Sequence, residues 1–472
     1  MGFVLLNFVL KGLFISHNAI ALDEPFSIYY AQMNLSSIIE FLSTGNNPPL
    51  YELFLHFWIN VFGISALSVR IPSLIFSCIT IFFIYKLAST FFNNRIAIYA
   101  SVFYLFSNNA ILYAHEARVY SLFALLTTLS MYCFFSLINN KPFSNLQKAL
   151  FILIQSLLIY AHYFGFFILF LQVAFILFNK NLRNIYWKRL LSFSLIILLL
   201  YTPNIKVLIN RFLDSSLNGT WVAKTTGIED LYNMLVHFSN APVLAVCVII
   251  IFVLAVIKSF KETHLISLNG QLLIIWFLVP FLFMFFLSYW VPVFIERYLM
   301  FLSTGFYLLL AITVDYLDFK KPIKYLAPII FCVLFLFTTD TKNTNKRNVI
   351  ETVEKIKELK SENSILYISP KWFDLNFVYY YKQAWFQDIE QHSNKTKMHD
   401  RLRSENIYFI KKGSEIYFKE LKQFEKILFL DVGSKSFSPN TEIIDKLSQF
   451  GKLKEQHEFH EIFTLYEFSV KE

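Results

Sequence analysis

The sequence is poor in charged residues and in cysteine. Charged side chains make up 16% of the 472 residues, whereas hydrophobic side chains make up 56% and include 55 Phe. This composition excludes a set of soluble domains, which would need a more polar surface, and favours a membrane protein. The four cysteines all fall within apolar runs, without the spacing of a metal site or of a disulfide framework. We therefore interpret them as small buried hydrophobic residues.

Sequence signals of several other functions are also missing. The chain has no phosphate-binding glycine motif and no internal repeat, and Asp431-Val432-Gly433-Ser434 is interpreted as a turn at the end of a strand. The first apolar run lacks a basic leader and a small-residue cleavage pattern, so residues 2–21 are expected to form a retained span. The formal charge of +9 is spread over loops and does not indicate a nucleic-acid site.

Long apolar runs dominate the chain as far as Phe337, each about 20 residues long, the length that crosses hydrocarbon. We expect eleven transmembrane helices, at 2–21, 68–92, 96–112, 119–138, 147–161, 163–179, 190–209, 241–257, 270–288, 298–316 and 324–339. Lys and Arg gather in every second connection, as in the one with Lys180 and Arg183. The positive-inside rule makes these connections cytoplasmic. The N-terminus is then cytoplasmic, and the residues after 340 are extracytoplasmic.

The first external segment, residues 22–67, begins with two adjacent carboxylates, Asp23 and Glu24. An ionised carboxylate at a membrane boundary can act as a general base that takes the proton from an attacking hydroxyl. Asp is also a favoured N-cap residue, and Asp23 precedes Pro25, so the pair can equally begin a helix. The two roles are compatible, and both remain open.

A helix is expected later in the same segment. Asn47-Pro48-Pro49-Leu50 opens it, because proline is tolerated in a first helical turn. Glu52, His56 and Asn60 recur every four residues in an otherwise apolar stretch, which places them on one helical face. This pattern predicts a helix that lies in the membrane interface and does not span the membrane.

Further ionisable residues fall on the external side of the predicted topology. Glu116 and Arg118 lie in the turn between the third and fourth spans, His162 lies in a short turn, and Glu296-Arg297 begins the tenth span. Arg118 can meet an anionic headgroup, since a guanidinium presents a planar fork to phosphate, or it can pair with Glu116. His162 can be a structural residue, and Glu296-Arg297 can be a snorkelling interfacial pair. Taken together, these residues predict an external amphipathic cavity suited to a lipid-phosphate substrate.

The character of the chain changes after Asp340. Charged helical patterns at 348–360 and 441–450 alternate with short apolar runs at 365–368, 407–410 and 427–430, and 459–468 is expected to be a final strand or hairpin. Alternation of this kind predicts a small α/β domain with a mostly parallel sheet. We therefore expect a membrane domain at 1–340, with 22–67 as its first external loop, and an extracytoplasmic domain at 341–472.

At the ionisable residues of its first 320 positions, the sequence resembles the bacterial family of GT-C membrane glycosyltransferases, glycosyltransferase family 39-like. This family includes protein O-mannosyltransferases and the aminoarabinose transferase of lipid A. The likeness covers roughly residues 1–320. Its matching stretches are Leu22-Asp23-Glu24, Asn47-Pro48-Pro49-Leu50-Tyr51, Phe62-Gly63, Ser68-Val69-Arg70-Ile71-Pro72-Ser73, Tyr113-Ala114-His115-Glu116-Ala117-Arg118-Val119-Tyr120-Ser121, Ala161-His162-Tyr163-Phe164-Gly165 and Arg297-Tyr298-Leu299. The resemblance implies a polytopic helical protein of the bacterial plasma membrane with the GT-C fold. It also implies inverting transfer of a sugar from a polyprenyl-phosphate donor to a hydroxyl of a lipid, glycan or protein on the outer face.

The resemblance implies roles for individual residues as well. Asp23 becomes the catalytic base, and Glu24 becomes its positioning or acceptor-binding neighbour. The residues implied to bind the substrate or its phosphate are Asn47, Tyr51, Glu116, Arg118, His162, Arg297 and Tyr298. Many relatives carry His where Asn47 stands, and Asn cannot be charged, which argues against an acid or phosphate role there. No Asp-x-Asp metal pair occurs in the first loop, so no cofactor is expected, although Asp23 and Glu24 could bind a divalent cation.

Two other functions remain open. A transporter or flippase of lipid-linked sugars would bind and translocate its substrate without chemistry, but such proteins often contain inverted repeats, and no repeat is visible here. An O-antigen ligase or polymerase would be expected to place its key cations in a large late external loop. Residues 210–240 form only a modest loop of that kind.

Overall fold

The computed structural model describes residues 1–43, 47–139, 143–218, 222, 227–262, 266–317, 325–344, 347–389, 395–416, 421–433, 440–460 and 462–470. The chain divides into two compact units. The first contains Met1–Ile15, Ile39–Tyr51 and Arg70–Asn343, and the second contains Ser16–Ile38, Glu52–Val69 and Thr344–Glu472. The second unit thus combines the C-terminal segment with parts of the first predicted external loop. The predicted domain boundary after residue 340 stays a prediction.

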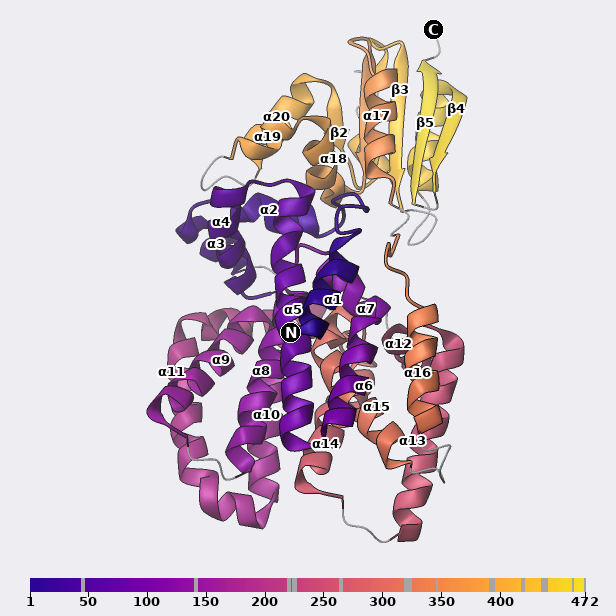
Figure 1. Cartoon of the computed structure of the whole chain (residues 1–472). Helices are drawn as coiled ribbons and strands as arrows, with labels where there is room; N and C mark the ends of the chain where they lie inside the picture. Colours follow the sequence, from indigo (N-terminus) through magenta and orange to yellow (C-terminus); the bar gives the residue numbers. More distant parts are fainter. Residues whose placement is uncertain are drawn as a thin grey trace. The chain divides into compact units, whose positions relative to one another are not determined.

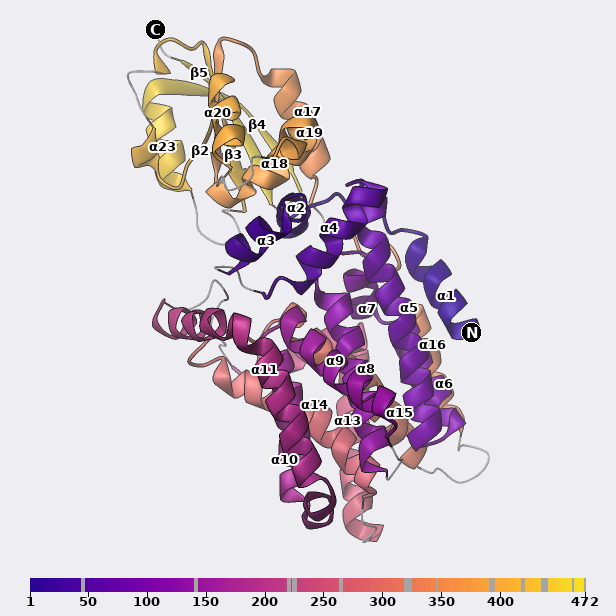
Figure 2. The same ribbon diagram turned by 90° about the vertical axis from the view of Figure 1, so that its left-hand side faces the viewer.

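The first unit is a bundle of helices (Figure 1). Its helices are α1 (Gly2–Gly12), α5 (Ala66–Phe91), α6 (Asn94–Leu105), α7 (Asn108–Ala114), α8 (Tyr120–Ile138), α9 (Asn145–Ala161), α10 (Gly165–Phe178), α11 (Lys180–Asn218), α12 (Glu229–Ser239), α13 (Pro242–Glu262), α14 (Leu268–Leu287), α15 (Met300–Tyr316) and α16 (Leu326–Phe337). A 3-10 turn, η1 (Glu296–Leu299), leads into α15. α15 packs against α6, α8 and α14 (Figure 1, Figure 2). The first nine residues of α15 are all buried.

The described part of the chain contains six helices that are long and apolar enough to cross a membrane, or seven if the bent pair α6 and α7 forms one span. α9, α10 and α16 are also apolar but shorter, with 17, 14 and 12 residues. The chain is therefore a multi-pass helical membrane protein, as the sequence predicts. The number of spans is lower by this criterion than the predicted eleven, because several predicted spans coincide with short helices.

Two predicted spans differ from the helices that occupy their positions. The run at 2–21 was expected to be one span, but α1 ends at Gly12, and the polar residues Ser16, His17 and Asn18 lie outside it. Gly12, a poor helix former, is the last residue of α1. The predicted span 190–209 lies inside α11, whose 39 residues continue past Pro203 into the segment expected to be a loop.

Local chemistry explains two features of the bundle near the predicted site. Ser107 accepts a hydrogen bond from the N–H of Ala110 and so begins α7, which meets α6 at a bend of 60°. The bend leads the chain into the turn that holds Glu116 and Arg118. Gly305 of α15 lies where a Cβ atom would come within 3.2 Å of Trp276 on α14. The close approach of these two helices therefore favours a residue without a side chain.

The C-terminal part of the second unit is an α/β domain with a five-stranded sheet of order β2-β1-β3-β5-β4 (Figure 1). The strands are β1 (Ser364–Ser369), β2 (Ile407–Phe409), β3 (Lys426–Val432), β4 (Gly451–Phe459) and β5 (Phe463–Val470). β1 pairs in parallel with β2 and β3, whereas β5 is antiparallel to both β3 and β4. The accompanying helices are α17 (Val349–Leu359), α18 (Asp374–Tyr381), α19 (Gln383–Gln387), α20 (Thr396–Ser404) and α23 (Thr441–Phe450).

The predicted strands at 365–368, 407–410 and 427–430 correspond to β1, β2 and β3, and both predicted helices are present as α17 and α23. α23 covers one face of the sheet through Ile443 and Leu447, and α17 lies on the other face (Figure 2). The expected final hairpin is longer than predicted, because residues 451–459 form β4. The sheet is accordingly parallel on one side only.

The first external segment forms three helices, α2 (Glu24–Ala31), α3 (Leu35–Leu42) and α4 (Leu50–Phe62). α4 confirms the helix expected after Asn47-Pro48-Pro49. Within the second unit, α2 lies against α18 of the α/β domain. The carboxylate pair at the start of α2 is therefore supported by a helix more than 300 residues away in the sequence.

Candidate active site

The carboxylate pair Asp23 and Glu24 lies at the N-terminus of α2. Asp23 occupies the N-cap position, but its side chain makes no cap hydrogen bond, and Pro25 provides the first turn. Glu24 is 4% exposed, and its Oε2 accepts a hydrogen bond of 3.5 Å from the N–H of Ala21. Leu22 has a φ of 54°, a left-handed conformation that side-chain-bearing residues rarely adopt. The backbone thus turns sharply just before the pair, and the Asp23 carboxylate is not used to cap the helix.

α4 holds α2 through the polar face that the sequence predicts. The hydroxyl of Ser27 donates a 2.7 Å hydrogen bond to Glu52, which is 4% exposed. His56 Nδ1 lies 2.8 Å from the carbonyl oxygen of Ala31, so Nδ1 carries the proton, and Asn60 Nδ2 donates to His56 Nε2 at 3.2 Å. The three residues are therefore structural here. Glu52 holds the middle of α2 through Ser27, and His56, supported by Asn60, holds its C-terminal end through Ala31.

In the first unit, the turn between α7 and α8 carries Glu116 and the largely buried Arg118. The hydroxyl of Ser73 donates a 2.7 Å hydrogen bond to the carbonyl oxygen of Glu116, and His115 Nε2 lies 2.5 Å from the carbonyl oxygen of Lys11. The guanidinium carbon of Arg118 is 6.0 Å from the ring centre of Tyr120. Hydrogen bonds between side chains and backbone carbonyls thus fix the turn to α1 and α5, and Arg118 keeps its guanidinium against an aromatic face.

His162 lies in the turn between α9 and α10 and is buried in an aromatic cluster. Its ring stacks on Phe123 with a centroid distance of 4.7 Å and meets Tyr298 edge-on at 5.7 Å. The N–H of Phe164 donates to His162 Nδ1 at 3.2 Å, which assigns the imidazole proton to Nε2. Burial, and next the charge of Arg118, lower the pKa of His162 to about 3. The imidazole is therefore neutral at physiological pH.

Glu296 and Arg297 precede α15 in the 3-10 turn η1. Glu296 Oε1 lies 2.8 Å from His237 Nε2 on α12, and the pair is partly exposed. Burial alone would lower the pKa of His237, but the hydrogen bond and the charge of Glu296 raise it above its usual value. Glu296, Arg297 and Glu116 all lie within electrostatic range of Tyr113. The first unit therefore brings together five predicted residues: Glu116, Arg118, His162, Arg297 and Tyr298.

A cavity of about 700 Å³ opens beside this cluster. Its walls are mostly apolar side chains of α10, α11 and the end of α14, with His162, Tyr163, Arg211, Ser215 and Tyr298 as polar groups. Within the described part of the chain, His162 Nε2 and the Tyr163 hydroxyl are buried without a hydrogen-bond partner. Two buried donors without a partner thus belong to side chains that line this apolar cavity.

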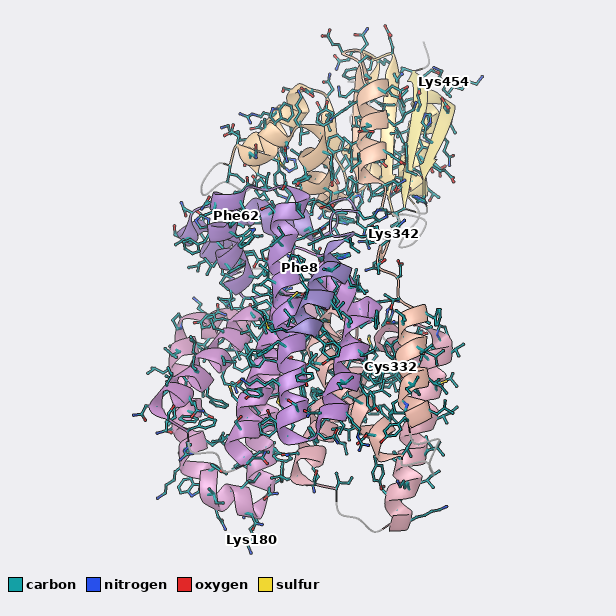
Figure 3. The ribbon with its side chains drawn as sticks, viewed as in Figure 1. Phe8, Phe62, Lys180, Cys332, Lys342 and Lys454 are labelled. Atoms are coloured by element: carbon teal, nitrogen blue, oxygen red, sulfur yellow. The ribbon has the colours of Figure 1, made fainter. Side chains whose placement is uncertain are left out.

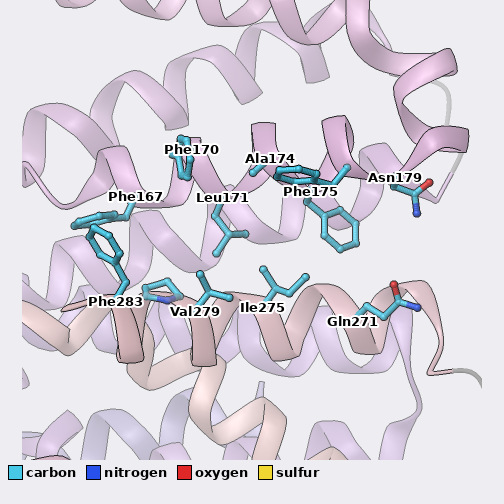
Figure 4. A pocket seen from close by; sticks show the side chains of 12 residues that line it. Phe167, Phe170, Leu171, Ala174, Phe175, Asn179, Gln271, Ile275, Val279 and Phe283 are labelled. Atoms are coloured by element: carbon cyan, nitrogen blue, oxygen red, sulfur yellow. The ribbon is translucent and has the colours of Figure 1, made fainter. Parts of the chain in front are cut away.

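A narrower groove of about 460 Å³ continues from the cavity between α10 and α14 and shares Phe167 and Phe170 with it. Figure 4 shows Phe167, Leu171 and Phe175 on one wall facing Val279 and Ile275 on the other. Asn179 and Gln271 lie together at one end of the groove (Figure 4). An apolar chain would therefore fit along almost the whole length of α10.

Asn47 and Tyr51, the two other predicted substrate-binding residues, belong to the first unit and are buried. The side-chain Oδ1 of Asn47 has no hydrogen-bond partner among the described residues. Asp23 and Glu24 belong to the second unit.

One group in the α/β domain has the composition of a metal site. Glu455, His457 and Glu467 place their ligand atoms within 4.8 Å of one another on β4 and β5. Glu467, however, is 2% exposed and already pairs with Lys426 at 3.1 Å and Lys454 at 3.3 Å. Two ammonium groups therefore neutralise the one buried carboxylate that a cation would need.

Sequence reasoning missed three residues of this site: Tyr163, Arg211 and His237. Tyr163 directly follows His162 in the matching turn, so its position next to a predicted site residue could have indicated it. Arg211 was expected in a loop, and only the continuation of α11 brings it to the cavity. The pairing of His237 with Glu296 joins distant segments and leaves no local pattern.

Comparisons with known proteins agree with this geometry. Residues 46–206 match the family model described as dolichyl-phosphate-mannose-protein mannosyltransferase. No protein of curated function matches the sequence. Two crystal structures of ArnT from Cupriavidus metallidurans, in the apo state and bound to undecaprenyl phosphate, each match with a TM-score of 0.61. Their sequence identities are 11% and 10%, and both matches cover 98% of this chain and 97% of that chain.

A third match is the archaeal oligosaccharyltransferase AglB from Archaeoglobus fulgidus, in complex with an inhibitory peptide and a dolichol-phosphate. Its TM-score is 0.53 at 11% identity, and the match covers 95% of this chain and 72% of that chain. The chain has the GT-C fold. The resemblance that the sequence motifs carry is thereby confirmed. In this GT-C fold, the matching motifs at 113–121, 161–165 and 297–299 contribute the residues that meet around His162.

Proposed function

We propose that the protein is an inverting glycosyltransferase that moves a sugar from a polyprenyl-phosphate donor to a hydroxyl acceptor on the outer face of the membrane. The observation that carries this proposal is the apolar cavity with two buried, unpaired donors, His162 Nε2 and the Tyr163 hydroxyl. A buried donor without a partner is costly, so a ligand that accepts both hydrogen bonds gains their full value. A lipid with a phosphate head matches both the apolar walls and the polar end.

Three arginines suit the phosphate of such a donor. Arg211 lines the cavity, Arg118 lies within electrostatic range of His162, and Arg297 adjoins Tyr298 in the sequence. Arg211 pairs with Asp214 at 3.1 Å, but exposed pairs of this kind are worth little and can reopen for a ligand. One guanidinium group can donate two parallel hydrogen bonds to two oxygens of a phosphate. Fixed cations also stabilise the charge that grows on phosphate as the sugar departs.

The chemical step requires a base for the acceptor hydroxyl, and Asp23 takes that role. Its carboxylate removes the proton, the oxygen attacks the anomeric carbon, and the bond from that carbon to the phosphate oxygen breaks. The polyprenyl phosphate leaves with the electron pair, and the anomeric centre inverts. Glu24, buried and bonded to the Ala21 N–H, positions this pair or binds the acceptor.

Asn47, Tyr51, Glu116 and Tyr298 complete the proposed substrate-binding set. Tyr298 is part of the cavity wall and of the aromatic cluster around His162. Glu116 shares the electrostatic surroundings of Tyr113 with Arg297. The buried, unpaired Oδ1 of Asn47 is a neutral acceptor for a sugar hydroxyl. The acceptor can be a lipid, a glycan or a protein, and no cofactor is expected, although Asp23 and Glu24 could bind a divalent cation.

The proposed topology has a cytoplasmic N-terminus, eleven membrane-crossing segments and an extracytoplasmic C-terminal domain in a bacterial plasma membrane. The distribution of basic residues supports this orientation. Lys180, where α10 meets α11, points away from the bundle into the end proposed to face the cytoplasm (Figure 3). The boundary between membrane and external domains is placed near residue 340.

The test is donor turnover by the purified full-length protein. Wild type, Asp23→Asn and a control, Glu40→Gln, are incubated with polyprenyl-phosphate sugars and a membrane extract as acceptor, and released polyprenyl phosphate is measured. Glu40 is an exposed acid of the same external segment. We expect wild type and Glu40→Gln to consume donor and Asp23→Asn to lose turnover while remaining folded. Donor binding without turnover by any of the three proteins would instead indicate a transporter.

A further inference from the structure

The backbone just before the carboxylate pair is held by the α/β domain. The side chain of Asn376 on α18 is 1% exposed, and its Nδ2 donates a 3.1 Å hydrogen bond to the carbonyl oxygen of Leu22. The N–H of Ile20 donates to the Tyr380 hydroxyl at 2.6 Å. Asn376 and Tyr380 are four residues apart and so lie on one face of α18. One face of α18 thus makes hydrogen bonds with the backbone at two positions, Ile20 and Leu22, just before Asp23.

These contacts stabilise the unusual backbone conformation at Leu22. Its positive φ of 54° is disfavoured for a residue with a side chain, and such a conformation persists only where the surroundings over-determine it. The Leu22 carbonyl itself accepts the hydrogen bond from Asn376. The hydrogen bond at Ile20 fixes the backbone that leads to Leu22. The direction in which Asp23 leaves the backbone follows from this turn.

α18 also contacts the far side of the same external segment. The Tyr379 hydroxyl donates a 2.8 Å hydrogen bond to the carbonyl oxygen of Ile64, which follows α4. Tyr379 and Tyr29 of α2 both meet the ring of Phe386 edge-on, at 5.2 Å and 5.4 Å. The helix therefore contacts the segment before α2, α2 itself through Phe386, and the segment after α4.

α18 is in turn fixed to the sheet domain. Asp374 at its first position is buried and binds Lys395 at 2.5 Å and His399 at 3.0 Å. At its other end, Lys357 of α17 donates a 2.8 Å hydrogen bond to the carbonyl oxygen of Tyr380. A cation near a helix C-terminus is favourable for the helix dipole. Contacts within the α/β domain thus hold both ends of α18, the helix that bonds the Leu22 carbonyl.

We propose that the C-terminal α/β domain is a positioning device for the proposed catalytic base, acting through Asn376 and Tyr380. These two are positioning residues, since their hydrogen bonds go to the backbone at Leu22 and Ile20, which leads into Asp23. The inference deepens the proposed function and rests on it for the role of Asp23. The contacts themselves do not depend on that role. Loss of either contact would let residues 20–22 leave the left-handed turn and disorient the carboxylate.

Hydrogen exchange of the full-length protein tests the contacts without any assay of activity. Asn376→Ala and Tyr380→Phe are compared with wild type for exchange of the amides of residues 20–31. Each variant removes one hydrogen bond, worth up to about a tenfold change in opening, so exchange there is expected to rise about tenfold. Matched controls are Asn363→Ala, whose Nδ2 bonds Glu425 on the domain surface, and Tyr408→Phe on β2. Unchanged exchange in both test variants overturns the proposal.

Donor turnover then separates positioning from mere structural support. We expect kcat to fall about tenfold in Asn376→Ala with KM for the donor unchanged, and Asn376→Gln, which keeps an amide donor, to recover part of the loss. Faster exchange with an unchanged kcat would overturn the positioning role. If Asn376→Ala fails to fold, Tyr380→Phe, which removes only an oxygen atom, carries both measurements. If wild type itself turns over no donor, the proposed function fails. The exchange result still shows whether Asn376 and Tyr380 hold residues 20–22 in place.

Discussion

The hydroxyl of Ser27 donates a hydrogen bond to the carboxylate of Glu52 across 2.7 Å, and both side chains are buried. This contact joins α2 to α4, the two helices that frame the carboxylate pair. The sequence pattern placed Glu52 on a polar face beside His56 and Asn60. The structure shows that this face turns toward α2, so its residues support the site instead of forming it.

Replacing Glu52 with Ala should destabilise the protein. Ser27 would lose a buried hydrogen bond to a charged acceptor, and such a bond is worth about 1.5–3 kcal/mol. Denaturant unfolding in detergent measures the change, and Glu40→Ala, at an exposed position of α3, is the control that should stay close to wild type. An equal effect at both positions would show that the Ser27 contact contributes nothing specific.

Arg118→Ala should impair donor turnover far more than folding. If the guanidinium stabilises the departing phosphate, its removal should lower kcat/KM by about 10²–10³-fold, the usual cost of losing one such group. Arg118→Lys should recover only part of this, because an ammonium lacks the planar fork. Arg183→Ala on α11 provides an arginine control whose guanidinium bonds the backbone at Leu177. Wild-type kinetics in Arg118→Ala would remove Arg118 from the site.

Filling the cavity should weaken binding of the lipid donor. Leu208 lines the cavity on α11, and Leu208→Trp would occupy part of it. Overfilling a shaped apolar space costs roughly 1–3 kcal/mol, so KM for the donor should rise about tenfold while kcat changes little. Leu199→Trp, on the same helix at a 72% exposed position, is the matched control. Equal KM values for the two variants would place the lipid elsewhere.

His162 should make the stability of the protein depend on pH. Its pKa in the folded protein is about 3, below the ordinary value of 6.5, so the unfolded chain binds more protons between these values. Stability from this group is therefore complete above pH 6.5 and falls as the pH falls through the window. We expect the melting temperature of wild type to drop more steeply than that of His162→Gln between about pH 7 and pH 5. His17→Gln, at an exposed position, should follow the wild-type slope.

Local pattern carried much of the fold. The apolar runs predicted a helical membrane protein, and the runs at 365–368, 407–410 and 427–430 predicted three buried strands, since each has an apolar face on both sides of the sheet. β4 escaped notice because Lys452, Lys454 and Glu455 leave it with little apolar alternation. α1 was expected to be longer, because composition alone does not show that Ser16, His17 and Asn18 lie outside the helix.

The candidate site was predictable to a similar extent and for a similar reason. Motifs gave Glu116, Arg118, His162 and Tyr298, which the structure groups in the first unit. Pairings between distant segments left no trace in the sequence. The bond of Asn376 to Leu22 and the pair of His237 with Glu296 both arise only when separate elements pack together. Tertiary contacts of that kind cannot be inferred from periodicity.

The order of the sheet leaves two strands, β2 and β4, at its edges. β2 is only three residues long, and β4 carries exposed Lys452, Lys454 and Glu455 along its length. A short edge offers few free backbone groups, and a charged edge repels another strand. Both borders are therefore poor templates for strand addition, which opposes aggregation of neighbouring copies crowded on one membrane surface.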